Sequence, residues 1–364
     1  MQVKRAANGR PAKLAGANAA IAGPGRPIDV TVVLLDGGYA STAIGPVEVF
    51  HSAGLLWNWL KGEPPQPRFR VRLASPRGRM VKSLCNVGIK PECALESIDR
   101  TDIAMVSASA WELQQRIMRH TSLIAWLRRM HAQGAYLGAV CSGAAFVAET
   151  GLMDGREATT HWGVAEALRE RYPNVRWRPE QFVTEDGRIC CSGGVYASID
   201  ISLYLVEKFC GREVALQTAR SLLVGLPRSC QSGYSVLPLS RPHTDKRIQK
   251  AEEHVRAHFR EDIGIDALAE RCAMSSRTFI RRFKAATGRL PGEYLQMMRV
   301  TAARELLEGD PASVREIGER VGYADTSFFR TVFKRHTGMT PAEYRGRFGP
   351  LQSGSGTLAP AGAG

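Results

Sequence analysis

The sequence has 364 residues, of which 44% are apolar, and it is too long for one ordinary domain and too apolar for a globally disordered chain. No run approaches the roughly 18 consecutive apolar residues that a helix needs to span a bilayer. The formal net charge of +14 at pH 7 favours an anionic partner, nucleic acid before a membrane surface. We expect no membrane association.

Residues 1–27 carry basic side chains and no acidic ones, and Gly and Pro interrupt them. They lack the continuous apolar stretch of a signal peptide, so we expect a disordered basic arm here. The eight cysteines are scattered, and none forms the Cys-x-x-Cys spacing of a zinc site. We therefore expect reduced thiols, no metal and no cofactor, in a cytoplasmic protein.

From residue 28 to about residue 225, strand-like apolar runs alternate with helical patterns. Strands are predicted over 29–35, 68–75, 102–109 and 135–140, and helices over 111–134 and 197–224. Such alternation is typical of an α/β domain whose mainly parallel sheet is covered by helices on both faces. Cys190 and Cys191 are neighbours in a later strand pattern, so their side chains should point to opposite faces and simply pack there.

The strand predicted over 135–140 runs directly into Cys141 and Ser142, and an Ala-rich helical segment follows. A strand that ends in a small-residue turn bearing a nucleophile is typical of a nucleophile elbow. The positive end of the following helix favours a thiolate, and His161, twenty residues later, is a candidate general base. Ligands of open parallel sheets bind at the carboxyl ends of the strands, which is where this elbow would lie.

Prolines, serines and a glycine are spread over residues 226–245 with little helical pattern, which predicts a linker. Beyond it the strand patterns disappear, and helices are predicted down to residue 348. The low-complexity residues 349–364 predict a disordered tail. The sequence therefore predicts an α/β domain over 28–225 followed by an all-α domain over 246–348.

The all-α domain contains an internal repeat at an offset of 50 residues. RTFIRRFKAATGRLPGEYLQ (277–296) matches SFFRTVFKRHTGMTPAEYRG (327–346) at two phenylalanines, a Thr-Gly pair, a proline and a Glu-Tyr pair. The phenylalanines are four residues apart, so both rings face the core and the opposite helix face is left for solvent or DNA. Each copy has the pattern of a helix-turn-helix whose second helix enters the major groove, and residues 290–309 predict a joining helix.

Residues from about 246 to 348 resemble the DNA-binding domain of the AraC family of transcriptional regulators, since both helix-turn-helix units and the joining helix are present. The resemblance implies that one polypeptide reads two successive major grooves of double-stranded DNA. It also implies base contacts from exposed positions of both second helices, namely Arg277, Ile280 and Arg281 in the first and Thr326, Ser327, Arg330 and Thr331 in the second.

Arginine can form two hydrogen bonds with a guanine edge, as Arg277, Arg281 and Arg330 would. Other basic residues are better placed for phosphates, which set the register but read no sequence: Arg282, Lys284, Lys334 and Arg335. Residues 246–348 carry 20 Lys and Arg against 14 Asp and Glu, and this net charge of +6 supports salt-dependent binding to the DNA backbone. The alternative, an ordinary solvated helix face, is disfavoured by the duplicated motif.

Residues 28 to about 225 resemble the PfpI and class I glutamine amidotransferase-like superfamily, on the elbow AVCSGAA, the segment ATTHW and the helix start GPVEVF. The order of the two domains resembles that of GlxA-type AraC-family regulators. Superfamily enzymes place an acid near the cysteine, but our alignment puts Thr42 at that position, with Glu48 a helical turn or more further on. Ser107 begins a Ser-Ala-Ser-Ala segment where Gly-Gly is usual, so the resemblance implies an elbow without its acid.

Four interpretations of Cys141 remain open: packing in a tight turn, a wall of an effector pocket, a redox or electrophile sensor, and a nucleophile for amide hydrolysis. Fold analogy does not choose between them. We favour the first two and expect no enzymatic activity. The candidate residues of the pocket or remnant elbow are Cys141, Ser142, His161, Trp162, Thr42, Glu48 and Ser107.

The sequence thus predicts a sequence-specific DNA-binding transcriptional regulator, expected to be an activator, that is controlled by a small effector bound in its α/β domain. We expect a homodimer that binds promoter DNA and RNA polymerase. The alternative is a cysteine-based redox sensor or a residual cysteine hydrolase fused to a DNA-binding domain.

Overall fold

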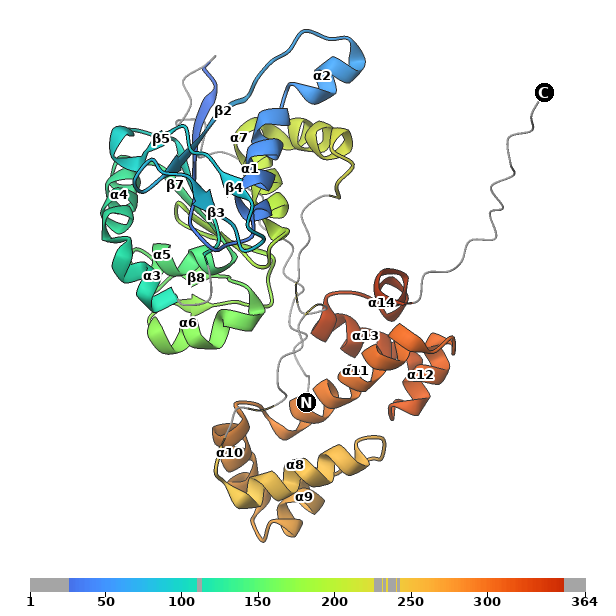
Figure 1. The fold of residues 1–364 in the computed structure, drawn as a ribbon. Helices are drawn as coiled ribbons and strands as arrows, with labels where there is room; N and C mark the ends of the chain where they lie inside the picture. The colour runs from blue at the N-terminus through green and yellow to red at the C-terminus, as the bar shows by residue number, and fades with distance from the viewer. Residues whose placement is uncertain are drawn as a thin grey trace, which may run out of the picture. The chain divides into compact units, whose positions relative to one another are not determined.

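The structure is a computed structural model that describes residues 26–109, 113–225, 231, 234, 240 and 243–349. The chain divides into two compact units, with the boundary between Ser229 and Cys230 (Figure 1). The arm expected over 1–27 and the tail expected over 349–364 lie almost wholly outside the described residues, as does most of the linker expected over 226–245.

Among the described residues of the first unit, seven strands form one sheet. They are β1 (Ile28–Val33), β2 (Phe69–Ser75), β5 (Cys93–Ala94), β6 (Ile103–Val106), β7 (Tyr136–Val140), β10 (Val183–Asp186) and β11 (Ile189–Ser192), in the spatial order β10-β11-β7-β6-β1-β2-β5. Every neighbouring pair is parallel except β10 and β11. All residues of β6, β7 and β11 are buried, as expected of parallel strands covered on both faces. The predicted α/β class is confirmed.

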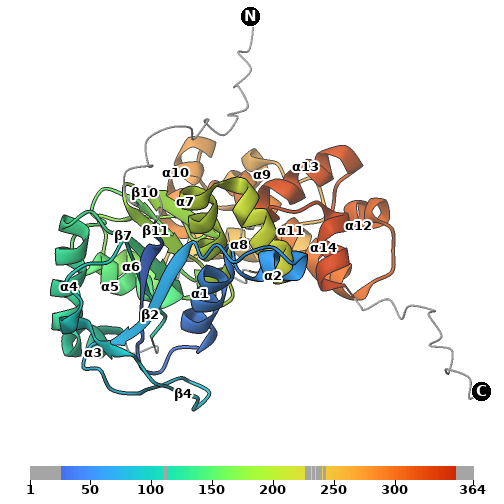
Figure 2. The ribbon, with the colours of Figure 1, turned by 90° about the horizontal axis from the view of Figure 1, so that it is seen from above.

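Helices cover both faces of this sheet (Figures 1 and 2). One face carries α1 (Ser41–Ser52) and α7 (Ala197–Ser221), and the other carries α3 (Leu113–Arg119), α4 (Thr121–Ala132), α5 (Ala144–Ala148) and α6 (Ala165–Arg171). An apolar core lies between the sheet and the helices on each face. Cys190 belongs to the core under α1 and α7 and Cys191 to the core on the other face, so the prediction that they point to opposite faces is confirmed. The remaining elements are α2 (Leu56–Lys61), β3 (Val81–Lys82), β4 (Gly88–Ile89), β8 (Glu157–Ala158) and β9 (Arg176–Trp177).

The single helix predicted over 111–134 is wrong in one respect, because the described part of this segment forms two helices. His120 separates α3 from α4 with φ −119° and ψ 37°, outside the helical region. Its ring lies 6.1 Å from that of Phe146 on α5. The helix therefore breaks at a residue that packs against a neighbouring element, with no Gly or Pro at the break.

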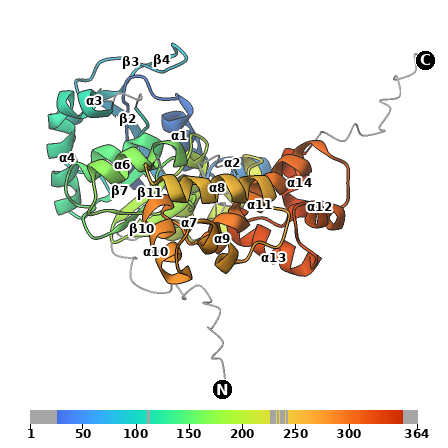
Figure 3. The ribbon, with the colours of Figure 1, turned by 90° about the horizontal axis from the view of Figure 1, so that it is seen from below.

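The described part of the second unit is entirely helical. It consists of α8 (Lys246–His258), α9 (Ile265–Arg271), α10 (Ser276–Thr287), α11 (Pro291–Gly309), α12 (Val314–Arg320), α13 (Thr326–Thr337) and α14 (Pro341–Phe348). The two helix-turn-helix pairs are α9–α10 and α12–α13, and α11 joins them (Figures 1 and 3). This arrangement is the predicted one.

Each helix-turn-helix pair has its own apolar core, and α11 contributes to both. Its first half supplies Tyr294 and Met298 to the core around Phe279 and Phe283. Its second half supplies residues such as Ala303 and Leu307 to the core around α12 and α13. Because one continuous helix is buried in two cores, it fixes the two helix-turn-helix pairs relative to each other.

The two copies repeat the same local geometry. Asp325 caps α13 by accepting hydrogen bonds from two backbone N–H groups, and Ser275 caps α10 by accepting one. Gly288 (φ 80°) and Gly338 (φ 76°) end these helices in the left-handed conformation that glycine adopts without strain. In both copies the second phenylalanine meets the tyrosine of the following helix edge to face, with ring centroids 5.4 and 5.5 Å apart.

We predict that Phe333→Ala lowers the free energy of unfolding of the second unit by about 3–5 kcal/mol, because the ring is fully buried and its removal leaves a cavity. All six tryptophans lie before residue 178. Circular dichroism of the full chain should therefore show the shifted helical transition, while tryptophan fluorescence should show an unchanged transition of the first unit. Phe328→Ala is the matched control, since Phe328 is 51% exposed and its loss should cost less than about 0.5 kcal/mol.

Candidate functional site

A pocket of about 520 Å³ opens at the carboxyl ends of the parallel strands. The loops that follow β1, β6, β7 and β11 converge there, as the sequence predicts for a ligand crevice. Its lining is mostly apolar and small, and among the described residues it contains no Asp, Glu, Lys or Arg. The lining residues are Gly37, Gly38, Tyr39, Leu84, Ala108, Ser109, Cys141, Ser142, His161, Val164, Val195 and Tyr196.

Cys141 sits at the turn between β7 and α5 with φ 57°, a conformation that non-glycine residues adopt at a cost. Two contacts fix this turn. Thr160 Oγ1 donates a hydrogen bond to the Cys141 carbonyl oxygen at 2.9 Å. A Cβ atom on Gly143 would lie 2.7 Å from the carbonyl oxygens of Val106 and Ser107, at the end of β6, so only glycine fits. The backbone geometry of a nucleophile elbow is therefore present.

The thiol of Cys141 is not activated by this geometry. Burial raises the pKa of Cys141 to about 11, although Ser142 lowers it slightly through hydrogen bonds from its backbone and side chain. The positive end of α5 was expected to lower the pKa of Cys141. Burial outweighs that effect, because α5 has only five residues and the side chain is enclosed. At neutral pH the residue is a protonated thiol.

His161 lines the same pocket, and burial lowers the pKa of its imidazole. Its Nδ1 accepts a hydrogen bond from the Gly163 backbone N–H at 3.0 Å, so the ring is neutral with its proton on Nε2. Among the hydrogen bonds of the described residues, none joins His161 to Cys141. The two side chains therefore share a pocket without forming a nucleophile–base pair.

Two hydroxyl groups tie the loops around the pocket together. Ser142 Oγ donates to the Ser109 carbonyl oxygen at 2.8 Å and accepts from its N–H at 3.0 Å. Thr42 Oγ1 donates to the Tyr39 carbonyl oxygen at 2.6 Å and accepts from the Ala108 N–H at 3.2 Å. Thr42 is buried on α1 and does not line the pocket. At the position where the sequence alignment expects the acid of superfamily enzymes, Thr42 thus joins two loops through its hydroxyl group.

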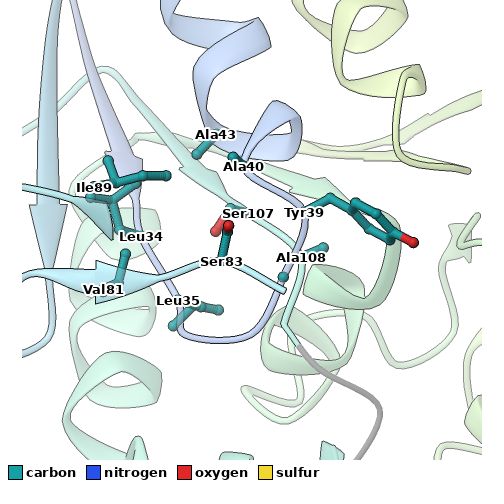
Figure 4. Close-up of a pocket in the computed structure, with 11 residues that line it drawn as sticks. Leu34, Leu35, Tyr39, Ala40, Ala43, Val81, Ser83, Ile89, Ser107 and Ala108 are labelled. Carbon is teal, nitrogen blue, oxygen red and sulfur yellow. The ribbon is translucent and has the colours of Figure 1, made fainter. Parts of the chain in front are cut away.

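The other predicted pocket residues lie elsewhere. Glu48 is exposed on α1, and Trp162 stacks beside His161 with ring centroids 5.1 Å apart, and neither lines the pocket. Ser107 lines a much smaller adjoining pocket, where it lies beside Ser83 among apolar side chains (Figure 4). The structure thus brings Cys141, Ser142 and His161 together in one pocket, whereas Thr42, Glu48, Ser107 and Trp162 do not line that pocket.

Several lining residues are not indicated by the sequence. Leu84 comes from the β3–β4 hairpin, which no motif marks. Tyr196 follows Gly193-Gly194 at the end of β11, and those glycines at the carboxyl end of a strand are a signal that could have located it. In the part of the chain that the structure describes, no group of three or more His, Cys, Asp or Glu side chains could hold a metal ion.

We call the second helix of each helix-turn-helix pair, α10 and α13, its recognition helix. On α10 the side chains of Arg277, Arg281 and Lys284 are exposed and Ile280 is half-buried. Arg282 differs from the expectation of a phosphate contact. Its Nε and Nη2 lie 3.0 and 2.8 Å from Asp245 Oδ2, and Asp245 also caps α8.

The counterpart of Arg282 in the second copy is Val332, which is buried. Arg282 itself is half-buried, with 40% of its side chain exposed, and its ion pair with Asp245 links the residue before α8 to α10. The phosphate contact expected of Arg282 stays a prediction, and a guanidinium already paired with Asp245 is a weaker candidate for it than the exposed Lys284.

On the second recognition helix, α13, Thr326 is half-buried. The other five predicted positions are exposed, namely Ser327, Arg330, Thr331, Lys334 and Arg335. Sequence reasoning missed Phe328, which is 51% exposed in the first turn of this helix. A pattern of phenylalanines four residues apart assigns Phe329 and Phe333 to the core and gives no role to the extra ring.

Comparison with known proteins matches both units. Residues 29–208 match the DJ-1/PfpI family model, and residues 268–347 match a helix-turn-helix domain model. The HTH-type transcriptional regulator CdhR of Pseudomonas aeruginosa is 27% identical over 297 residues, which are 81% of this chain and 87% of the relative. The HTH-type transcriptional regulator GlxA of Rhizobium meliloti is 29% identical over 291 residues, which are 78% of this chain and 87% of the relative. The crystal structure of an AraC family transcriptional regulator from Pseudomonas putida is 21% identical, covers 54% of this chain and 100% of its own, and has a TM-score of 0.46.

The fold, the duplicated helix-turn-helix unit and these relatives define a DNA-binding transcriptional regulator. The chain carries a DJ-1/PfpI domain followed by an AraC-type helix-turn-helix domain, in the order that its sequence predicts, and it is similar to the regulator named GlxA. In the described part of the chain, no helix is both long and apolar enough to cross a membrane.

We predict that Cys141 reacts slowly with iodoacetamide near neutral pH and that its rate rises only toward an apparent pKa near 11, because burial disfavours the thiolate. The exposed Cys85 should be labelled first and serves as the internal control. Site-resolved mass spectrometry over a pH series measures both rates. An apparent pKa for Cys141 below the ~8.5 of a free thiol would contradict this assignment.

Proposed function

We propose that the DJ-1/PfpI domain is a non-catalytic sensor whose pocket beside Cys141 and His161 binds a small effector that controls DNA binding. The observation that carries this proposal is a pocket of about 520 Å³, within the usual size range of ligand sites, in which the thiol stays protonated. The neutral His161 offers one Nε2–H donor to a bound molecule. The effector changes DNA binding to the extent that it binds one arrangement of the protein better than another.

The alternative, a cysteine-based sensor or hydrolase, needs a thiolate and a base. A thiolate is the reactive form of cysteine, and the pKa of about 11 leaves little of it at neutral pH. His161 makes its hydrogen bond with Gly163 instead of the thiol. These two features favour the ligand pocket over chemistry at Cys141.

For the second unit we propose that α10 and α13 enter two successive major grooves of promoter DNA. The joining helix α11 has 19 residues, and a helix of that length spans about 28 Å, which is comparable to one turn of the duplex. The exposed Arg277, Arg281 and Arg330 are suited to guanine edges, and Lys284, Lys334 and Arg335 to phosphates. We further propose a cytoplasmic homodimer that activates transcription by recruiting RNA polymerase.

The pocket is tested with Val195→Trp, which fills it from a half-buried lining position. A metabolite library is screened by thermal shift on the full chain, and each hit is assayed for its effect on DNA affinity. We expect hits to stabilise the wild type and Cys141→Ser alike, and to lose their effect on Val195→Trp. Equal stabilisation of the Val195→Trp variant, or loss of every hit in Cys141→Ser, would overturn the proposal.

DNA reading is tested with neighbouring arginines of α10. Arg281→Ala should weaken specific binding by about 1–3 kcal/mol and relax the preference at one base pair, because an exposed bidentate contact is lost. Arg282→Ala is the matched control, since this side chain is held by Asp245, and it should leave the base preference and the salt dependence of binding unchanged. Fluorescence anisotropy with specific and scrambled duplexes measures both. A larger loss of specificity in Arg282→Ala would reverse the assignment.

A further inference from the structure

The two helix-turn-helix copies agree at the buried aromatic and threonine positions that build much of their cores. Phe279, Phe283, Thr287 and Tyr294 have the same residue types at the offset of 50, and all eight side chains are buried. The threonines even repeat their hydrogen bonds, each donating to the carbonyl oxygen of the second phenylalanine at 2.8 Å. These four core positions, which hold each recognition helix in place, are therefore the same in both copies.

The copies differ wherever the first two turns of the recognition helices face outward. Four pairs of outward positions carry different residue types in the two copies. The pairs are Arg277 and Ser327, Thr278 and Phe328, Ile280 and Arg330, and Arg281 and Thr331. Identical residues at the four core positions, with four different outward residues, mean that the two helices present different chemistry to DNA. Arginines lie at 277 and 281 in the first, while the second carries one arginine and an aromatic ring.

Phe328 is the most distinctive of these differences. It lies in the first turn of α13, where recognition helices contact base edges, and its side chain is 51% exposed. Its ring meets the edge of Tyr323 at 5.9 Å, and Tyr323 is in turn packed against Phe329 and Arg299. The ring is therefore held in position before any partner binds, which reduces the entropy lost on binding.

The major groove offers one apolar group to such a ring, the C5-methyl group of thymine. We propose that Phe328 reads a thymine methyl group in the second half-site and makes that half-site different in sequence from the one read by α10. Burial of a methyl group needs no hydrogen-bond partner, so an exposed phenylalanine is sufficient. This inference rests on DNA reading by α13 and is independent of the effector pocket.

The test starts from a binding sequence selected from a random duplex pool by the full chain. Each thymine of that sequence is then replaced by uracil, which removes only the methyl group. One replacement should weaken binding to the wild type about fourfold, the value of a buried methyl group, and should leave binding to Phe328→Ala unchanged. Thr278→Ala, at the same position of the first copy, should respond to that uracil as the wild type does.

Other outcomes would contradict either the thymine contact of Phe328 or sequence-specific DNA binding as a whole. If each uracil lowers the DNA affinity of the wild type and of Phe328→Ala equally, Phe328 does not read thymine. The same conclusion follows if Phe328→Ala lowers the affinity for specific and for scrambled DNA alike. If Phe328→Ala binds the selected DNA normally but no longer activates transcription with purified RNA polymerase, the ring contacts a protein and the proposal is wrong. A chain that selects no sequence would instead contradict sequence-specific DNA reading as a whole. Unchanged thermal stability of Phe328→Ala confirms that the variant is folded.

Discussion

Parallel strands all end at the same edge of their sheet, and the organisation of the first unit depends on this constraint. Four loops that are far apart in the sequence meet at that edge, and each contributes to the pocket. Hydrogen bonds from Ser142 to Ser109 and from the Ala108 N–H to Thr42 then join the loops to one another. The shape of the pocket is therefore determined mainly by backbone positions, and it persists whether or not the cysteine has any chemical role.

The state of Cys141 follows from a comparison of two energies. A pKa of about 11, against ~8.5 for a free thiol, corresponds to about 3 kcal/mol in favour of the thiol. The interaction of an anion with a helix end is worth about 0.3–1 kcal/mol at an exposed site. Burial therefore prevails over the helix end, and the same turn that exposes a nucleophile in an open active site leaves a neutral sulfur here.

The sequence was sufficient where a structural feature is encoded locally. The Thr-Gly ends and the phenylalanine spacing of the repeat predicted both helix-turn-helix units correctly, because caps and periodicity act within a few residues. The break at His120 and the pairing of Arg282 with Asp245 were not predictable in this way, since both depend on partners more than 20 residues away.

The repeat itself contained an unused signal for the second unit. The counterpart of Arg282 is Val332, a buried apolar residue at the same position of the repeat, and this comparison marks the position of Arg282 as partly covered. For the pocket, the strand ends located Cys141 and Ser142, but Leu84 lies on a hairpin whose path only the folded chain reveals.

The divergence of the outward residues has a geometric consequence for the complex with DNA. Two identical reading helices would let one chain dock on its site in either of two nearly equivalent registers. With different residues on α10 and α13, only one order of the two half-sites matches the protein. If both helices read DNA as proposed, a single chain lies on the duplex with a defined polarity.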